Sequence, residues 1–135
     1  MAKYEIQTPK VLDLGPNTLI SGFSDAHGSA GDVFLGFFVD LTIGDLTTLQ
    51  FAMYTENPDG SDVPWMDASN TSIGVTGLAA SMTRFFWAGS TNTSNDQLNS
   101  HGLVMPSALK VFYLGNKAGV GTEIGLWLVT ASVMA

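Results

Sequence analysis

The sequence predicts an all-β protein, an antiparallel β-sandwich or jelly roll of about eight strands in a single domain over residues 1–135. Apolar side chains recur at every second residue along 33–43 and 49–54, a period typical of strands with one buried face. Clusters of Gly, Pro, Asp and Asn separate the apolar stretches at short intervals, as in sandwiches. The chain has 15 Gly and 8 Phe but no Cys, so its stability is expected to come from an apolar core rather than from disulfides.

The first 32 residues are predicted to form short strands and one loop. Residues 3–7 have the pattern of an edge strand, which ends at Pro9 because proline cannot donate a ladder hydrogen bond. Residues 11–14 form a strand end that enters a tight turn, and 18–23 are a short apolar piece. The segment 24–32 has the composition of a loop.

Residues 33–65 carry the strongest pattern and organise the predicted fold. The second of two long strands places Leu49, Phe51 and Met53 on one face, and the turn at 44–46 predicts that the two strands pair as a hairpin. In the first strand, the residues expected on the buried face are Val33, Leu35, Phe37, Val39, Leu41 and Ile43.

Two phenylalanines of the first strand fall on its opposite face. Phe34 and Phe38 indicate a second packing surface, against a loop or a partner, rather than a cofactor site. The strand is too short for a membrane span of about 20 residues, and Asp40 interrupts it.

The remaining elements follow from turn signals and alternation. The Asn57–Gly60 segment and its flanks combine Pro, Asp and Gly in turn order, and aromatic residues occupy both faces of a strand at 82–88. The other expected elements are a short strand at 63–67, an irregular connection at 68–81, a polar loop at 89–100, a strand at 108–114, a hairpin turn at 115–121 and a closing strand at 122–134. The residues expected to be fully buried are Leu35, Phe37, Val39, Phe51, Val111, Leu126 and Leu128.

Charge and composition exclude several classes of partner. The net charge is −7 with only 5 Lys and Arg, which argues against a basic surface for nucleic acid. Only 13% of residues are charged, against about 25% in an ordinary soluble domain, so part of the surface is expected to be covered by another molecule. The first ten residues contain no apolar run of signal-peptide length, and we expect synthesis in a cytoplasm without export.

No catalytic, cofactor-binding or metal-binding constellation emerges, and we expect a protein that is not an enzyme and needs no cofactor. His27 and His101 lack the spacing of a ligand pair, and no G-x-S-x-G elbow is present. Lys117 stands five residues before Thr122, which fits a hairpin loop rather than a phosphate-binding loop. The segment around Asp59 lacks the ligand spacing of an EF-hand and is expected to be a simple turn.

Three segments together resemble small capsid cement or decoration proteins of tailed bacteriophages, and the resemblance spans most of the chain. They are the D-L-G entry at 13–15, the strand 48–55 followed by the Asn57–Gly60 turn, and the strand 109–114 followed by the Gly-rich segment 119–122. The resemblance implies a non-enzymatic virion protein that binds the major capsid protein lattice at the capsid surface. The resemblance implies no catalytic residues in this chain.

Exposed aromatic residues are the candidate contact points of such a protein. We expect Phe34, Phe38, Phe85 and Trp87 at an interface, in a homo-oligomer (dimer or trimer) or against a capsid. The alternative is a carbohydrate- or receptor-binding module of a tail fibre or similar. Its signature would be aromatics such as Trp65, Trp87 or Tyr54 displayed on a groove with polar neighbours.

Overall fold

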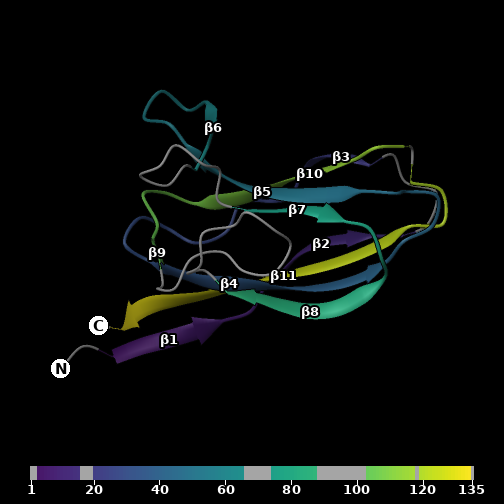
Figure 1. The fold of residues 1–135 in the computed structure, drawn as a ribbon. Coiled ribbons are helices and arrows are strands. Elements are labelled where there is room, and N and C mark those ends of the chain that lie inside the picture. Colours follow the sequence, from purple (N-terminus) through teal and green to yellow (C-terminus); the bar gives the residue numbers. More distant parts are fainter. Residues whose placement is uncertain (1–2, 16–19, 66–73, 88–102, 118, 135) are drawn as a thin grey trace.

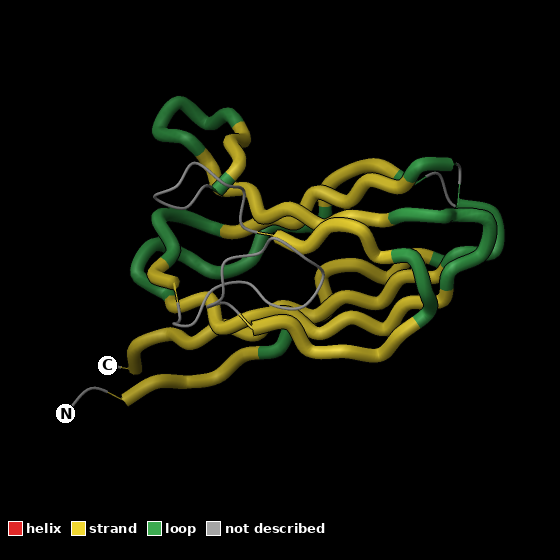
Figure 2. Tube along the Cα trace, in the orientation of Figure 1, coloured by secondary structure: helices red, strands yellow, loops and turns green. Residues whose placement is uncertain are grey.

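Two antiparallel sheets pack face to face in the computed structural model, which describes residues 3–15, 20–65, 74–87, 103–117 and 119–134 (Figure 1). The described residues contain strands and loops and no helix, as the predicted all-β sandwich requires (Figure 2). They include eleven strands rather than about eight, because β7 and β9 are short and lie in segments without clear alternation.

Sheet 1 has its longest strand, β11, in the middle. Its neighbour order is β1-β11-β4-β8; β2 pairs with β11 as well, and β9 pairs with β4. Its strands are β1 (Lys3–Gln7), β2 (Lys10–Leu14), β4 (Val33–Thr42), β8 (Met82–Trp87), β9 (Leu103–Val104) and β11 (Glu123–Met134).

Sheet 2 is built around β5 and β10. Its neighbour order is β3-β10-β5-β6, and β7 pairs with β5 beside β6. Its strands are β3 (Ser21–Phe23), β5 (Leu49–Glu56), β6 (Asp62–Pro64), β7 (Gly74–Leu78) and β10 (Leu109–Gly115).

The expected hairpin of β4 and β5 is wrong, because the two strands belong to different sheets. β4 pairs with β11, β5 pairs with β10, and the segment 43–48 arches from one sheet to the other. The segment 116–122 makes a second arch between β10 and β11, so the expected hairpin at 115–121 is also wrong. The apolar faces of consecutive strands therefore meet across the core instead of lying side by side.

The two arches are held together at one end of the sandwich. Asn116 accepts hydrogen bonds from the backbone N–H groups of Thr47 (2.9 Å) and Thr48 (3.1 Å) through Oδ1, and Thr122 Oγ1 accepts one from Gly44 N–H. A Cβ atom at Gly44 would lie 2.1 Å from the Val120 carbonyl oxygen, so the arches approach this closely only with glycine there.

A β-bulge in β4 reverses the predicted faces of its first residues. Gly36 lies opposite Val129 while Phe34 lies opposite Thr130, so Leu35 has no opposite residue in β11. The extra residue turns Phe34 inward, where it is fully buried, and leaves Leu35 half-buried. The expectation that Leu35 is a core residue and Phe34 an outer one is therefore wrong.

The bulge depends on Gly36. Its φ of +149° lies in a region that favours glycine, and a Cβ atom would meet the carbonyl oxygen of Phe86 at 2.2 Å. The remainder of the predicted core is confirmed. At most 1% of the surface of each of these residues is exposed: Phe37, Val39, Phe51, Val111, Leu126 and Leu128.

Candidate functional site: the outer faces of the two sheets

The outer face of sheet 1 carries a row of aromatic side chains. Phe38 lies directly opposite Phe85 of β8 on one side and opposite Trp127 of β11 on the other. The rings of Phe38 and Trp127 meet edge to face, with centroids 5.7 Å apart. Phe37, Phe86 and Leu126, the chain neighbours of these residues, are buried in the core, so the row itself faces outward.

Trp127 packs along its own strand and covers a glycine. A Cβ atom at Gly125 would lie 3.1 Å from the indole ring, which therefore occupies the space that a side chain at 125 would need. The Lys10 ammonium lies 4.8 Å from the centroid of the indole ring, and it pairs with Asp13 at 3.2 Å. The indole thus separates the apolar part of this face from a charged end.

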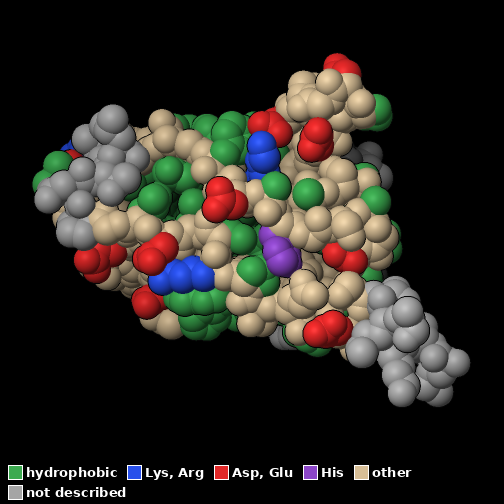
Figure 3. Space-filling view, turned by 180° about the vertical axis from the view of Figure 1, so that it is seen from behind, with side chains coloured by type: hydrophobic (Ala, Val, Ile, Leu, Met, Phe, Trp, Pro, Cys, Tyr) green, Lys and Arg blue, Asp and Glu red, His purple; other side chains and the backbone are tan. Residues whose placement is uncertain are grey.

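That charged end is a shallow polar groove. It has a volume of about 220 Å³, and its lining includes Lys10, Asp13, Asp40, Glu123 and Trp127. Asp40 already accepts a hydrogen bond from the Thr83 hydroxyl at 3.1 Å. Acidic side chains are spread over the back of the molecule, and the basic side chains visible there lie beside them (Figure 3).

The outer face of sheet 2 carries a second aromatic group, the sheet 2 cluster of Phe23, Tyr54 and Phe112. The ring of Phe23 lies 5.1 Å from each of the other two, and Tyr54 and Phe112 are 5.8 Å apart. Phe23 is 44% exposed, although it lies opposite Phe112 in the ladder. The alternation of β5 and β10 explains the cluster, because their inward neighbours Met53 and Val111 fill the core.

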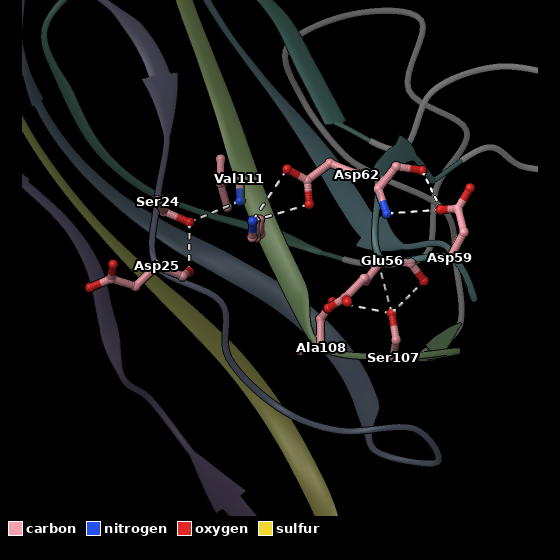
Figure 4. A network of polar contacts seen from close by, with 10 residues as sticks. Ser24, Asp25, Glu56, Asp59, Asp62, Ser107, Ala108 and Val111 are labelled. Atoms are coloured by element: carbon pink, nitrogen blue, oxygen red, sulfur yellow. Dashed lines mark hydrogen bonds and ion pairs between the residues drawn. The ribbon is translucent and has the colours of Figure 1, made fainter.

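A salt bridge borders the sheet 2 cluster. Lys110 Nζ lies 3.1 Å from Asp62 Oδ1 and 3.2 Å from Oδ2, so that β6 and β10 are joined across β5 (Figure 4). The same ammonium lies 5.8 Å from the centroid of the Phe23 ring. Both charged side chains are about one-third exposed, and they form a polar rim on one side of the aromatic surface.

The structure brings together two of the four expected interface residues. Phe38 and Phe85 share the outer face of sheet 1, whereas Phe34 points inward and packs on Trp65 with ring centroids 6.0 Å apart. The side chain of Trp87 lies outside the described residues. Of the aromatics named for a sugar groove, Tyr54 lies in the sheet 2 cluster, while Trp65 packs against the core and so does not share a groove with it.

Sequence reasoning missed Trp127, Phe23 and Phe112. Trp127 had a detectable signal, because it alternates with Leu126 and Leu128, which were both predicted to face inward. Phe112 alternates in the same way with Val111. Phe23 is the last residue of the very short strand β3, whose three residues are too few to show a period.

The other chemical candidates are accounted for by local structure. His27 lies in the loop after β3, and its Nε2 is 3.2 Å from Gln7 Oε1. Asp59 accepts hydrogen bonds from Ser61 Oγ (2.7 Å) and Ser61 N–H (2.9 Å), which lower the pKa of its carboxyl group. Lys117 lies in the arch between β10 and β11 rather than at the head of a helix. His101 lies outside the described residues.

Neither a metal cluster nor a membrane-spanning helix is found in the described part of the chain. Among those residues, no three His, Cys, Asp or Glu side chains are grouped closely enough to hold a metal ion. The same residues include no helix with the length and apolarity needed to cross a bilayer. Comparison with protein-family models, curated protein sequences and solved structures gives no match to this chain.

Proposed function

We propose that this chain is a non-enzymatic virion protein, a cement or decoration protein that binds the capsid lattice of a tailed bacteriophage and stabilises it. The proposal rests on the resemblance in three sequence segments and on the two outer faces of the sandwich. In this proposal the protein is made in the host cytoplasm and works on the capsid surface.

The observation that carries the proposal is that both outer faces display aromatic side chains. An antiparallel sheet that faces water usually alternates apolar inward residues with polar outward ones. Here Phe38 and Trp127 face outward from sheet 1, and Phe23 and Phe112 face outward from sheet 2. A subunit that is covered on two sides, by a lattice and by other copies, would use both surfaces.

The sheet 2 cluster is the better candidate for the capsid contact. Interfaces between different proteins combine an aromatic centre with a polar rim. Phe23, Tyr54 and Phe112 supply such a centre, and the Lys110–Asp62 pair supplies charged groups at its edge. Each copy would contribute a modest interface, and the many copies on a particle would together stabilise the shell.

Co-sedimentation with virus-like particles, assembled from the capsid genes of the source virus, tests the proposal. We expect the wild-type chain to pellet with the particles and Phe23→Ser to bind at least tenfold more weakly. Val120→Ser is the matched control, because Val120 is a similarly exposed apolar residue in the arch, outside both sheets. Binding that is absent in wild type, or unchanged in Phe23→Ser, would contradict the proposal.

A second candidate function is binding of a carbohydrate on the sheet 2 cluster. The exposed ring of Phe23 could stack on a sugar, and Lys110 and Asp62 could orient its hydroxyl groups. Retention on immobilised polysaccharide, lost in Phe23→Ser and reversed by free sugar, together with no binding to particles, would favour this candidate over capsid binding.

A further inference from the structure

Next to the aromatic row of sheet 1 is an uncharged hollow. It has a volume of about 300 Å³ and is lined by Thr8, Phe38, Phe85, Trp127 and Val129. Gly36 lies between Val129 and β8, and the Phe85 ring packs over it, since a Cβ atom at Gly36 would lie 2.9 Å from Phe85 Cζ. A hollow without charged groups is best filled by apolar side chains.

The N-terminal strand offers such side chains on the same face. Tyr4 is 54% exposed and Ile6 is 57% exposed, although both lie within a strand that is paired with β11. Gln7 lies opposite Thr130, which is buried and faces inward, so Ile6 and Tyr4 must face outward. The ribbon of β1 and the end of β11 extends beyond the body of the sandwich (Figure 1).

We infer that two copies of this chain pair through the outer faces of sheet 1, with Ile6 of each copy inserted into the hollow of the other. The two complementary parts occur on one face, so a twofold axis lying in the interface would satisfy both contacts at once. The inference goes beyond the proposed function, since it holds whatever surface the sheet 2 cluster binds.

The spacing of the rows supports this pairing. Outward residues of β11 follow at about 6.8 Å, so the Phe38–Trp127 row and the Ile6–Ala131 row are about 14 Å apart. The Gly36–Val129 row lies midway between them. A twofold axis near this row places the Phe38–Trp127 row of each copy opposite the Ile6–Ala131 row of the other.

The distribution of charge favours a second copy over another partner. Asp13, Asp40 and Glu123 lie at the end of the face farthest from β1, and no charged group lines the hollow. The overlapping middle of the pair is therefore uncharged, and Glu123 lies beyond the end of the other copy. Interfaces between identical subunits are more apolar than those between different proteins, and this face is more apolar than that of the sheet 2 cluster with its salt bridge.

Cysteine cross-linking tests the pairing directly, because the chain contains no cysteine. Ile6→Cys and Phe38→Cys are made separately and mixed under mild oxidation. We expect a disulfide-linked dimer in the mixture and little cross-linking in either variant alone, since the Ile6–Ala131 row of each copy faces the Phe38–Trp127 row of the other. Cross-linking of Ile6→Cys with itself would indicate pairing through the β1 edges and would overturn the inference.

Sedimentation at micromolar concentration gives a second, independent measurement. We expect a wild-type dimer whose dissociation constant rises at least tenfold in Ile6→Ser, while Val120→Ser remains dimeric. Ile6 is exposed, so its replacement leaves the fold intact, and a thermal melt verifies this. A wild-type chain that is monomeric at all concentrations would overturn the inference, even if it binds particles through the sheet 2 cluster.

Discussion

Phe37 of β4 and Phe51 of β5 face each other across the core, with ring centroids 6.0 Å apart and planes at 72°. The two strands are consecutive in the chain but belong to opposite sheets. The contact therefore joins the sheets, and Phe86 of β8, which lies opposite Phe37 in the ladder of sheet 1, also packs on Phe37 with ring centroids 5.2 Å apart.

Replacement of Phe37 should test this central position. We expect Phe37→Ala to lower the free energy of unfolding by about 3–5 kcal/mol, because a fully buried ring is removed from between two others. Leu35→Ala is the control, and we expect it to cost only about 1 kcal/mol because Leu35 is half-buried beside the bulge. Urea unfolding measures both values, and equal losses would show that the bulge is misplaced.

The bulge itself can be tested at Gly36. We expect Gly36→Ala to cost about 3 kcal/mol or more, since the added Cβ would combine backbone strain with a contact to the Phe86 carbonyl oxygen. Gly31→Ala separates the two causes: Gly31 has a φ of +90° but open space around it, and we expect a loss of about 1–2 kcal/mol. Similar thermal melts for the two variants would exclude the steric contribution.

Asn116 should stabilise the two arches through its side-chain oxygen. We expect Asn116→Ala to cost about 1–2 kcal/mol, because the N–H groups of Thr47 and Thr48 lose their acceptor. Asn116→Asp retains an acceptor and should recover most of the loss at neutral pH. Lys117→Ala, at the next residue, should leave the stability unchanged. A loss of stability as large as that of Asn116→Ala would argue against a stabilising role of the Asn116 hydrogen bonds.

The turn between β5 and β6 should respond to acid. Ser61 hydrogen bonds lower the pKa of Asp59, so the ionised carboxylate stabilises the turn above the ordinary pKa near 3.8, and this contribution is lost as the pH falls through the lowered value. An NMR titration should show an Asp59 midpoint below the ordinary one. Ser61→Ala should raise that midpoint and Ser61→Thr should not; an identical midpoint in Ser61→Ala would refute the assignment.

Chelation should have no effect on stability. The Asp59 carboxylate is occupied by Ser61, and the turn around it lacks the spacing of a calcium loop. We expect the same melting temperature before and after treatment with EDTA. A shift of several degrees would point instead to a bound cation at the Asn57–Asp62 turn.

Alternation in the sequence was sufficient to predict the strands and most of the core, because successive side chains of a strand point to opposite faces of the sheet. Phe51, Val111 and Leu126 were found where the period of two placed them. The period could not reveal the bulge, since one extra residue at Leu35 is defined only by the register with β11. It also could not distinguish a hairpin from an arch, because a connection at 43–48 is compatible with both.

The candidate site was predictable only in part. Phe38 and Phe85 were expected on an outer face, because the alternation within each strand is enough to predict the direction of its side chains. The hollow and the sheet 2 cluster combine residues from strands that are distant in sequence, such as Phe23, Tyr54 and Phe112. Their proximity depends on sheet order, which a single sequence does not specify.

The central position of β11 has a consequence for biosynthesis. β11 is synthesised after the other ten described strands, yet β1, β2 and β4 all pair with it, and Lys3 finds its partner at Met134. Sheet 1 therefore cannot close until β11 has left the ribosome, and until then the nascent chain must hold its apolar β4 without its β11 neighbour. Folding of sheet 1 should therefore be late and slow for a chain of this size, and a truncation that removes β11 should leave an aggregating chain rather than a smaller domain.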